Sequence, residues 1–176
     1  MGATATAMLE SWVESDPLDT ADVVELYQDM VYAISLTHTR CRGDADDVFQ
    51  EVFLAYHRKQ PECNDEEHRK AWLITTTLNI ARRHASNSWR TRVVPLYPEV
   101  TDAAPAEFRF DIDEYDALFK AVSCLPDNYR SVIHLFYFED LSVAQIASVL
   151  ALEPSTVKMR LSRGRTMLRE TMTEES

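Results

Sequence analysis

Glycine is scarce in this chain, and its scarcity restricts the folds that the chain can adopt. The 176 residues include three glycines and seven prolines, and long runs of residues separate the prolines. A sheet protein of this length needs many tight turns, which these two residue types favour. Hydrophobic residues make up 45% of the chain, which is enough for a packed core. The sequence therefore predicts an all-α protein, with room for one ordinary domain or two small ones.

Apolar residues recur at helical spacing in two groups. Val23 and Ile34 belong to the first helix, which we expect to end at a left-handed Gly43. Two more helices follow, and the second starts with a capping-box-like pair, Asn64 and Glu67. The periodicity then stops, and three prolines within eleven positions indicate a linker that can move. The predicted organisation is a tail over residues 1–16, a helical domain over 17–92, a flexible linker over 93–112 and a second helical domain over 113–172.

The clearest local pattern lies near the C-terminus. Ser142 and Gln145 have capping-box spacing, and Leu141 and Ile146 flank them as a hydrophobic staple. After a short turn, Pro154 opens the last helix. Two helices joined by a tight turn, the second of them basic, are typical of a helix-turn-helix, whose second helix enters the DNA major groove. The alternative is an amphipathic terminal helix with a charged outer face.

Basic residues are concentrated in two segments of an acidic chain. The chain has 29 acidic and 18 basic residues and a net charge of −11. Residues 80–94 nevertheless carry four arginines without an acid, and residues 154–169 carry one lysine and four arginines without an acid. This pattern predicts contact with nucleic acid at two chosen places rather than general polyanion binding. Solvated helix faces are the alternative.

Several other classes of function find no support in the sequence. No run approaches the roughly 20 apolar residues of a membrane span, and the N-terminus does not resemble a signal peptide. We therefore expect a cytoplasmic protein without membrane insertion. Cys41, Cys63 and Cys124 are scattered, so we expect neither a metal site nor a disulfide framework. The five histidines have no nucleophile or metal partner in sequence, so we expect no enzyme and no cofactor.

Both halves of the chain contain stretches that are similar to the motifs of one known family. The stretch "TVKMRLSRGR" is similar to the family's "TVKSRLxRAR" in its second DNA-binding domain. In the first half, "DADDVFQEVFLAYHR" resembles "DAEDLVQEVFLRAWR", and "KAWLITTTLNIARRHASNSWR" resembles "WLxxIaxNlxxdxlR". The chain thus resembles the bacterial RNA polymerase sigma factors of the extracytoplasmic-function (ECF) type, and the resemblance covers about residues 20–92 and 113–170, in the family's order. It implies a subunit that binds core polymerase, directs it to promoters through the −10 and −35 elements and helps to melt the DNA.

The resemblance also implies three sets of contact residues and one inhibitory partner, an anti-sigma factor. The second helix of the first domain would bind the clamp helices of the largest polymerase subunit through Asp46, Asp47, Gln50, Glu51 and Phe53. The third helix and its basic end would contact the −10 element and melted DNA through Trp72, Asn79, Arg82, Arg83, His84, Trp89, Arg90 and Arg92. The second domain would contact the polymerase flap and would bind the −35 element through Ser155, Thr156, Lys158, Met159, Arg160, Ser162, Arg163 and Arg165.

The residue types suit these roles, although some alternatives stay open. Melting leaves unstacked bases that aromatic rings can hold, and arginines neutralise phosphates. Trp72 suits a core position better than base stacking, whereas Phe53 suits the core and a polymerase contact equally. Arg83 and Met159 stand where the family has Asp and Ser. Ala151 replaces the glycine of the turn, which requires a strained residue or another turn geometry.

A free-standing transcriptional regulator, which would use the helix-turn-helix without polymerase, is the leading rival function. The first half of the chain distinguishes the two hypotheses. Such a regulator has no need of an acidic polymerase-binding helix or of a second basic segment.

Overall fold

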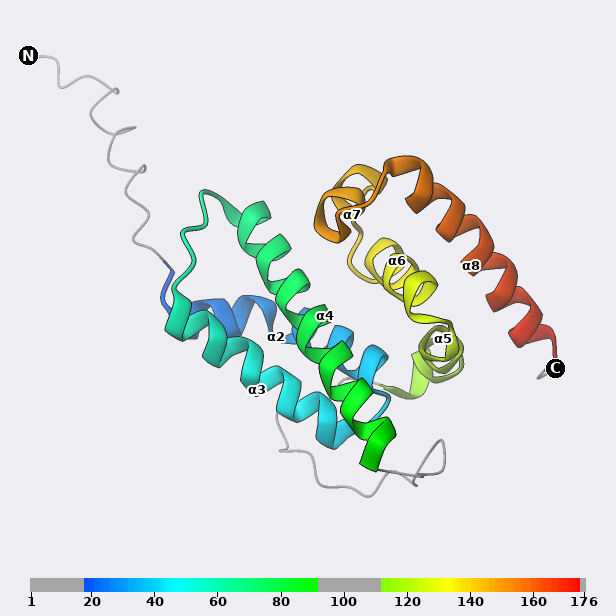
Figure 1. The fold of residues 1–176 in the computed structure, drawn as a ribbon, viewed down its shortest axis with the longest axis horizontal. Coiled ribbons are helices and arrows are strands. Elements are labelled where there is room, and N and C mark those ends of the chain that lie inside the picture. The colour runs from blue at the N-terminus through cyan, green and yellow to red at the C-terminus, as the bar shows by residue number, and fades with distance from the viewer. Residues whose placement is uncertain (1–17, 92–111, 175–176) are drawn as a thin grey trace, which may run out of the picture.

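All the regular elements in the described part of the chain are helices. A computed structural model describes residues 18–91 and 112–174, and these ranges form seven helices and no strands (Figure 1). The predicted tail and most of the predicted linker lie outside the described residues. The prediction of an all-α protein is confirmed. The helices are α2 (Thr20–Thr39), α3 (Arg42–Lys59), α4 (Glu66–Thr91), α5 (Ile112–Cys124), α6 (Asp127–Tyr137), α7 (Val143–Leu150) and α8 (Pro154–Glu174).

Helices α2, α3 and α4 pack on one another and form the first helical unit. Each helix contributes an apolar stripe, because residues three or four positions apart share a face. The innermost side chains have no exposed surface, among them Val23, Ile34, Val48, Val52 and Leu73. None of the described helices is long and apolar enough to span a membrane.

Two helix boundaries differ from the sequence prediction. Helix α2 ends at Arg40, which takes the left-handed conformation at φ 57°, whereas Gly43 lies in the first turn of α3. The left-handed residue is thus a bulky arginine, which a local glycine rule does not find. At the start of α4, Asp65 rather than Asn64 accepts the backbone N–H of the first turn.

The second helical unit contains the predicted helix-turn-helix. The Ser142 Oγ accepts the Gln145 N–H at 3.2 Å, and the Gln145 side chain accepts the Ser142 N–H at 2.9 Å, so the predicted capping box is confirmed. Ala151 ends α7 in the left-handed conformation, at φ 52° and ψ 49°. The turn therefore holds a strained alanine where the family pattern has glycine. Of the two alternatives that the sequence left open, a strained residue or another turn geometry, the structure has the first.

Helix α8 lies against α6 and α7 (Figure 1). Val157, Leu161 and Gly164 form the buried stripe that faces these helices. A Cβ added to Gly164 would lie 2.8 Å from Ile133 Cγ1. The glycine thus permits the close approach of α8 to α6.

The two helical units contact each other. Helix α2 touches α5 and α6, and α4 touches α7. In Figure 1 the second unit lies beside α2 and α4, and Arg82 of α4 donates from Nε to Asp127 Oδ2, at the start of α6, at 2.9 Å. Side chains that the sequence assigns to separate DNA contacts are therefore brought near one another.

Candidate nucleic-acid and polymerase interfaces

The outer face of α8 presents most of the predicted −35 residues to solvent. Val157 and Leu161 hold the opposite face in the core. This arrangement leaves the N-terminal turns of α8 free to enter a major groove. Thr156 and Arg160 are half-buried, and the exposed members are Ser155, Lys158, Met159, Ser162, Arg163 and Arg165.

Arg165 differs from the other predicted −35 residues because α6 holds its side chain. Its Nε donates to the Tyr137 hydroxyl at 2.7 Å, and its guanidinium lies 5.7 Å from the ring centroids of Phe136 and Tyr137. A cation so placed is stabilised by the aromatic faces. In this structure Arg165 thus fastens α8 to α6, and its contact with DNA stays a prediction.

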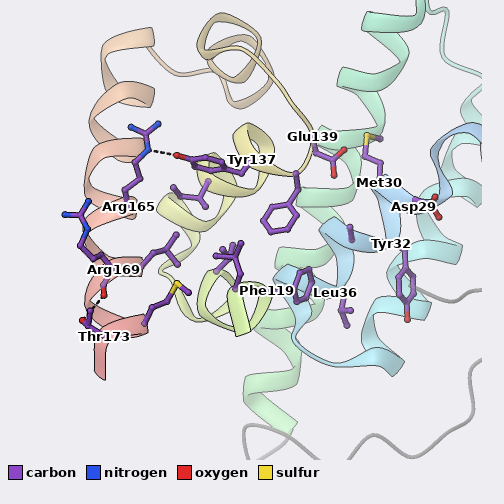
Figure 2. A pocket seen from close by; sticks show the side chains of 17 residues that line it. Asp29, Met30, Tyr32, Leu36, Phe119, Tyr137, Glu139, Arg165, Arg169 and Thr173 are labelled. Carbon is purple, nitrogen blue, oxygen red and sulfur yellow. Dashed lines mark hydrogen bonds between the residues drawn. The ribbon is translucent and has the colours of Figure 1, made fainter. Parts of the chain in front are cut away.

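A groove of about 820 Å³ runs beside Arg165, between α2 and the helices α5, α6 and α8 (Figure 2). Its walls are mainly apolar. Leu118, Tyr137 and Met172 line it and are 38%, 51% and 43% exposed. Exposed apolar surface concentrated in one place is typical of a protein contact.

Helix α4 carries most of the residues predicted to contact the −10 element, and the structure describes the side chains of only some of them. Asn79 and Arg83 are exposed, and Arg82 and His84 are half-buried. Trp72 packs edge-on against Tyr56, with 5.6 Å between the ring centroids, and is half-buried at the core of the first unit. This placement agrees with the core role that the sequence favoured for Trp72. Trp89, Arg90 and Arg92 lie outside the described side chains.

Glu51 joins α3 to the basic part of α4. One carboxylate oxygen accepts from Arg83 Nη2, and the other lies 3.1 Å from His84 Nε2. Burial raises the pKa of Glu51, but the hydrogen bonds and charges of His84 and Arg83 outweigh it and lower the pKa overall. A residue predicted to bind polymerase therefore holds two residues predicted to bind DNA.

The outer face of α3 carries the remaining predicted polymerase contacts. Asp46, Asp47 and Gln50 are exposed. Phe53 is 6% exposed, and its ring lies 4.9 Å from that of Phe49, so it occupies the core. The apolar residue on the exposed face is instead Leu54, which is 50% exposed and which the sequence analysis missed. The signal in the sequence that could have identified this residue is its position, because Leu54 directly follows the buried stripe of α3 at Phe53.

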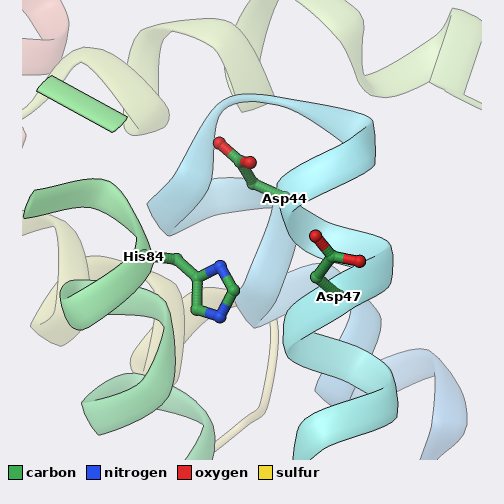
Figure 3. A group of neighbouring side chains, drawn as sticks. All are labelled: Asp44, Asp47 and His84. Carbon is green, nitrogen blue, oxygen red and sulfur yellow. The ribbon is translucent and has the colours of Figure 1, made fainter. Parts of the chain in front are cut away.

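Asp44, Asp47 and His84 form a cluster between α3 and α4 (Figure 3). One ligand atom from each lies within 4.8 Å of the others. Carboxylates and imidazole are donors that a divalent cation accepts. Exposed acidic groups often gather in this way without an ion, so we assign no metal to them.

Two regions of one family match this chain in order. Sigma-70 region 2 matches residues 23–91, and sigma-70 region 4 matches residues 115–168. The first match covers α2 to α4, and the second covers most of α5 to α8. Together with the exposed recognition helix, they define the class of sigma-70 type polymerase subunits.

Curated relatives place the chain within that class. It is 27% identical to the ECF RNA polymerase sigma factor SigW of Bacillus subtilis, over 85% of this chain and 87% of that protein. It is also 27% identical to the ECF RNA polymerase sigma factor SigE of Mycolicibacterium smegmatis, over 98% of this chain and 69% of that protein. A probable sigma factor, RfaY of Xanthomonas campestris, is 32% identical over 84% of this chain, which spans 38% of that protein. The chain belongs to the RNA polymerase sigma factors of the ECF type.

Solved structures share the fold. CnrH in complex with the cytosolic domain of CnrY has a TM-score of 0.63 at 22% identity, and the match covers 89% of each chain. The sigma factor RpoE of Bartonella quintana, in complex with the anti-sigma factor NepR, has a TM-score of 0.64 at 22% identity, covering 87% of this chain and 96% of that one.

Proposed function

We propose that this chain binds core RNA polymerase in the cytoplasm and directs it to specific promoters, without chemistry of its own. The observation that carries the proposal is the presence of both sigma regions in order, with a solvent-facing recognition helix in the second. Residues 17–92 would form the first domain, and residues 113–172 the second. Binding free energy would place the polymerase and hold the separated strands.

The second domain would bind the −35 element through α8. Lys158 and Arg163 project from its free face, where long cationic side chains can reach base edges. Arg169 lies further along the helix, where a phosphate contact is the natural role. We therefore assign promoter choice to the first two and general affinity to the third.

The first domain would bind polymerase through the exposed acidic face of α3. Asp46, Asp47 and Gln50 supply charge and hydrogen bonds, and Leu54 supplies an apolar anchor. The apolar groove beside α8 suits a helix of the polymerase flap, because amphipathic helices bind in grooves of this kind.

An anti-sigma factor is the inhibitory partner that we propose. Both solved structures named above contain a further protein beside the chain that resembles this one, and for RpoE that protein is an anti-sigma factor. A pull-down with the full chain tests this. Recovery of a second protein that blocks polymerase binding supports the proposal, and recovery of polymerase alone contradicts it.

Transcription from genomic DNA with purified core polymerase tests the main proposal. Addition of the chain should raise initiation at a limited set of promoters, and the same reaction with Lys158→Ala should change that set. No initiation above core polymerase alone would contradict the proposal. Tight binding of the free chain to promoter duplex without polymerase would favour the free-standing regulator.

A further inference from the structure

Within the N-terminal turns of α8, Met159 points most directly away from the protein core. Val157 stands two positions before it and Leu161 two positions after it, and these side chains are 0% and 3% exposed. An α-helix turns by about 100° per residue, so Met159 lies opposite the direction midway between the two buried side chains. The Met159 side chain is 41% exposed. In the described part of the chain, α8 packs on α5, α6 and α7, all on its buried side.

The residues around Met159 leave it protruding between two cations. Ser155 lies one turn before it and Ser162 one turn after it on the same face, and both are exposed. Their short side chains make methionine the longest apolar group along this line. Lys158 and Arg163 lie on either side of the line and are also exposed. Because this segment of α8 contains no acid, the surface around Met159 attracts a polyanion and repels a basic protein surface.

Exposure alone does not give Met159 a role, because single apolar side chains are common on protein surfaces. Its position adds the constraint. In the DNA binding that we propose, the N-terminal turns of α8 enter the major groove, so their most outward side chain meets the base edges. An apolar side chain makes no hydrogen bond there, and it gains free energy only where it leaves water against another apolar group.

Thymine supplies such a group. Its C5-methyl lies in the major groove, where the edges of the other three bases present hydrogen-bond donors and acceptors. The methionine side chain is unbranched and polarizable, so it adapts to an irregular apolar contact. The serine of the family pattern can instead hydrogen-bond to several bases. The exchange of serine for Met159 therefore moves the preference at this position from a polar edge to a methyl group.

We propose that Met159 is a specificity-determining residue, which makes this chain prefer a thymine in the −35 element by packing on the C5-methyl group of that base. The inference rests on the proposed function, because that function places α8 in the major groove of the −35 element. It deepens that function by assigning a base to one side chain. Lys158 and Arg163 would hydrogen-bond to neighbouring base edges, and Met159 discriminates by an apolar contact.

Replacement of thymine by uracil tests this contact, because it removes one methyl group and keeps every base-pairing hydrogen bond. Sequencing of the DNA bound by the reconstituted polymerase complex first gives the −35 element. Each thymine of that element, on either strand, is then replaced singly by uracil. At one position the affinity of the wild-type complex should fall about fourfold, the size expected for one buried carbon. With Met159→Ser, uracil at that position should leave the affinity nearly unchanged.

Two controls isolate the methyl contact. Met159→Leu keeps an apolar side chain of similar volume, so it should keep most of the discrimination between thymine and uracil. Uracil placed in the spacer between the −10 and −35 elements should leave the affinity of the wild-type, Met159→Ser and Met159→Leu complexes unchanged. Binding of Met159→Ser to core polymerase without DNA should equal that of the wild-type chain.

The outcomes separate this contact from the proposed function. Any of three results overturns the assignment of Met159 while the proposed function stands: a −35 element without thymine, equal losses with uracil in the wild-type and Met159→Ser complexes, or weaker binding of Met159→Ser to polymerase alone. The third result would make Met159 a protein contact. If the wild-type complex prefers no promoter and initiates no transcription above core polymerase, the proposed function itself is wrong, and the contact fails with it.

Discussion

The two basic segments look alike in sequence but differ in the folded chain. On α8, Lys158 and Arg163 face solvent on a helix whose other side is fixed in the core. On α4, Arg82 is bonded to Asp127, and Arg83 is bonded to Glu51. Charge clustering thus identifies the places suited to nucleic acid, whereas tertiary contacts decide which place is available at once. In the DNA binding that we propose, the α8 segment can act as it stands, whereas the α4 segment must first exchange the partners of Arg82 and Arg83.

Acidification should reduce most the difference in availability between the basic segments of α4 and α8. Burial lowers the pKa of His38 to about 4, although the hydrogen bond and charge of Asp127 raise it, and Arg130 and His134 lower it further. The packing of the two helical units on each other (closure) holds His38 neutral, so closure is strongest above pH 6.5 and weakens as the pH falls from 6.5 towards 4. The loss at pH 4 is at most about 3 kcal/mol. Fluorescence energy transfer between dyes on α2 and α8 should fall over this window.

His38→Asn supplies the control for acidification. Its amide can donate to Asp127 but does not titrate, so energy transfer should stay constant between pH 6.5 and 4.5. Equal pH dependence in the two chains would show that another group controls closure.

Substitutions on α8 should have the next largest effect. Lys158→Ala and Arg163→Ala should each weaken binding of the polymerase complex to its promoter by about 1–3 kcal/mol and relax the preferred −35 sequence. Arg169→Ala should lower affinity evenly across sequences. Sequencing of the DNA bound by each reconstituted complex measures both effects. A change in sequence preference with Arg169→Ala alone would reverse the assignment.

Gly164→Ala should have a smaller effect, because two terms oppose each other. The methyl group would lie 2.8 Å from Ile133 Cγ1, and overpacking costs about 1–3 kcal/mol. Alanine gains about 1 kcal/mol in helix propensity. We expect a net loss of about 1 kcal/mol in the free energy of unfolding, measured with urea. In an Ile133→Ala chain the same change should become stabilising; a loss there would show that the backbone, not Ile133, limits the approach.

Arg82→Ala should change stability least. The Arg82 and Asp127 side chains are 40% and 46% exposed, and exposed ion pairs contribute about 0–1 kcal/mol. The midpoint of thermal unfolding should therefore move little. A loss well above 1 kcal/mol in the free energy of unfolding would show that the Arg82–Asp127 pair is mainly structural.

Local signals were predictable from the sequence, and distant pairings were not. The Ser142 capping box follows from residues within a few positions of each other, whereas the sequence left two geometries open at Ala151. The burial of Phe53 and the exposure of Leu54 depend on the rotation of α3 against α2 and α4, which one helix cannot reveal. The bond between Arg82 and Asp127 joins residues 45 positions apart, and no periodicity indicates it.

The carboxylate of Glu51 makes two surfaces dependent on each other. It lies on α3, whose outer face we assign to polymerase, and holds Arg83 and His84 of α4, which we assign to DNA. Any ligand that draws Glu51 away releases a cation on the other helix. Thermodynamic linkage then requires the effect to be mutual: the factor by which polymerase changes the affinity of α4 for DNA equals the factor by which DNA changes the affinity of α3 for polymerase.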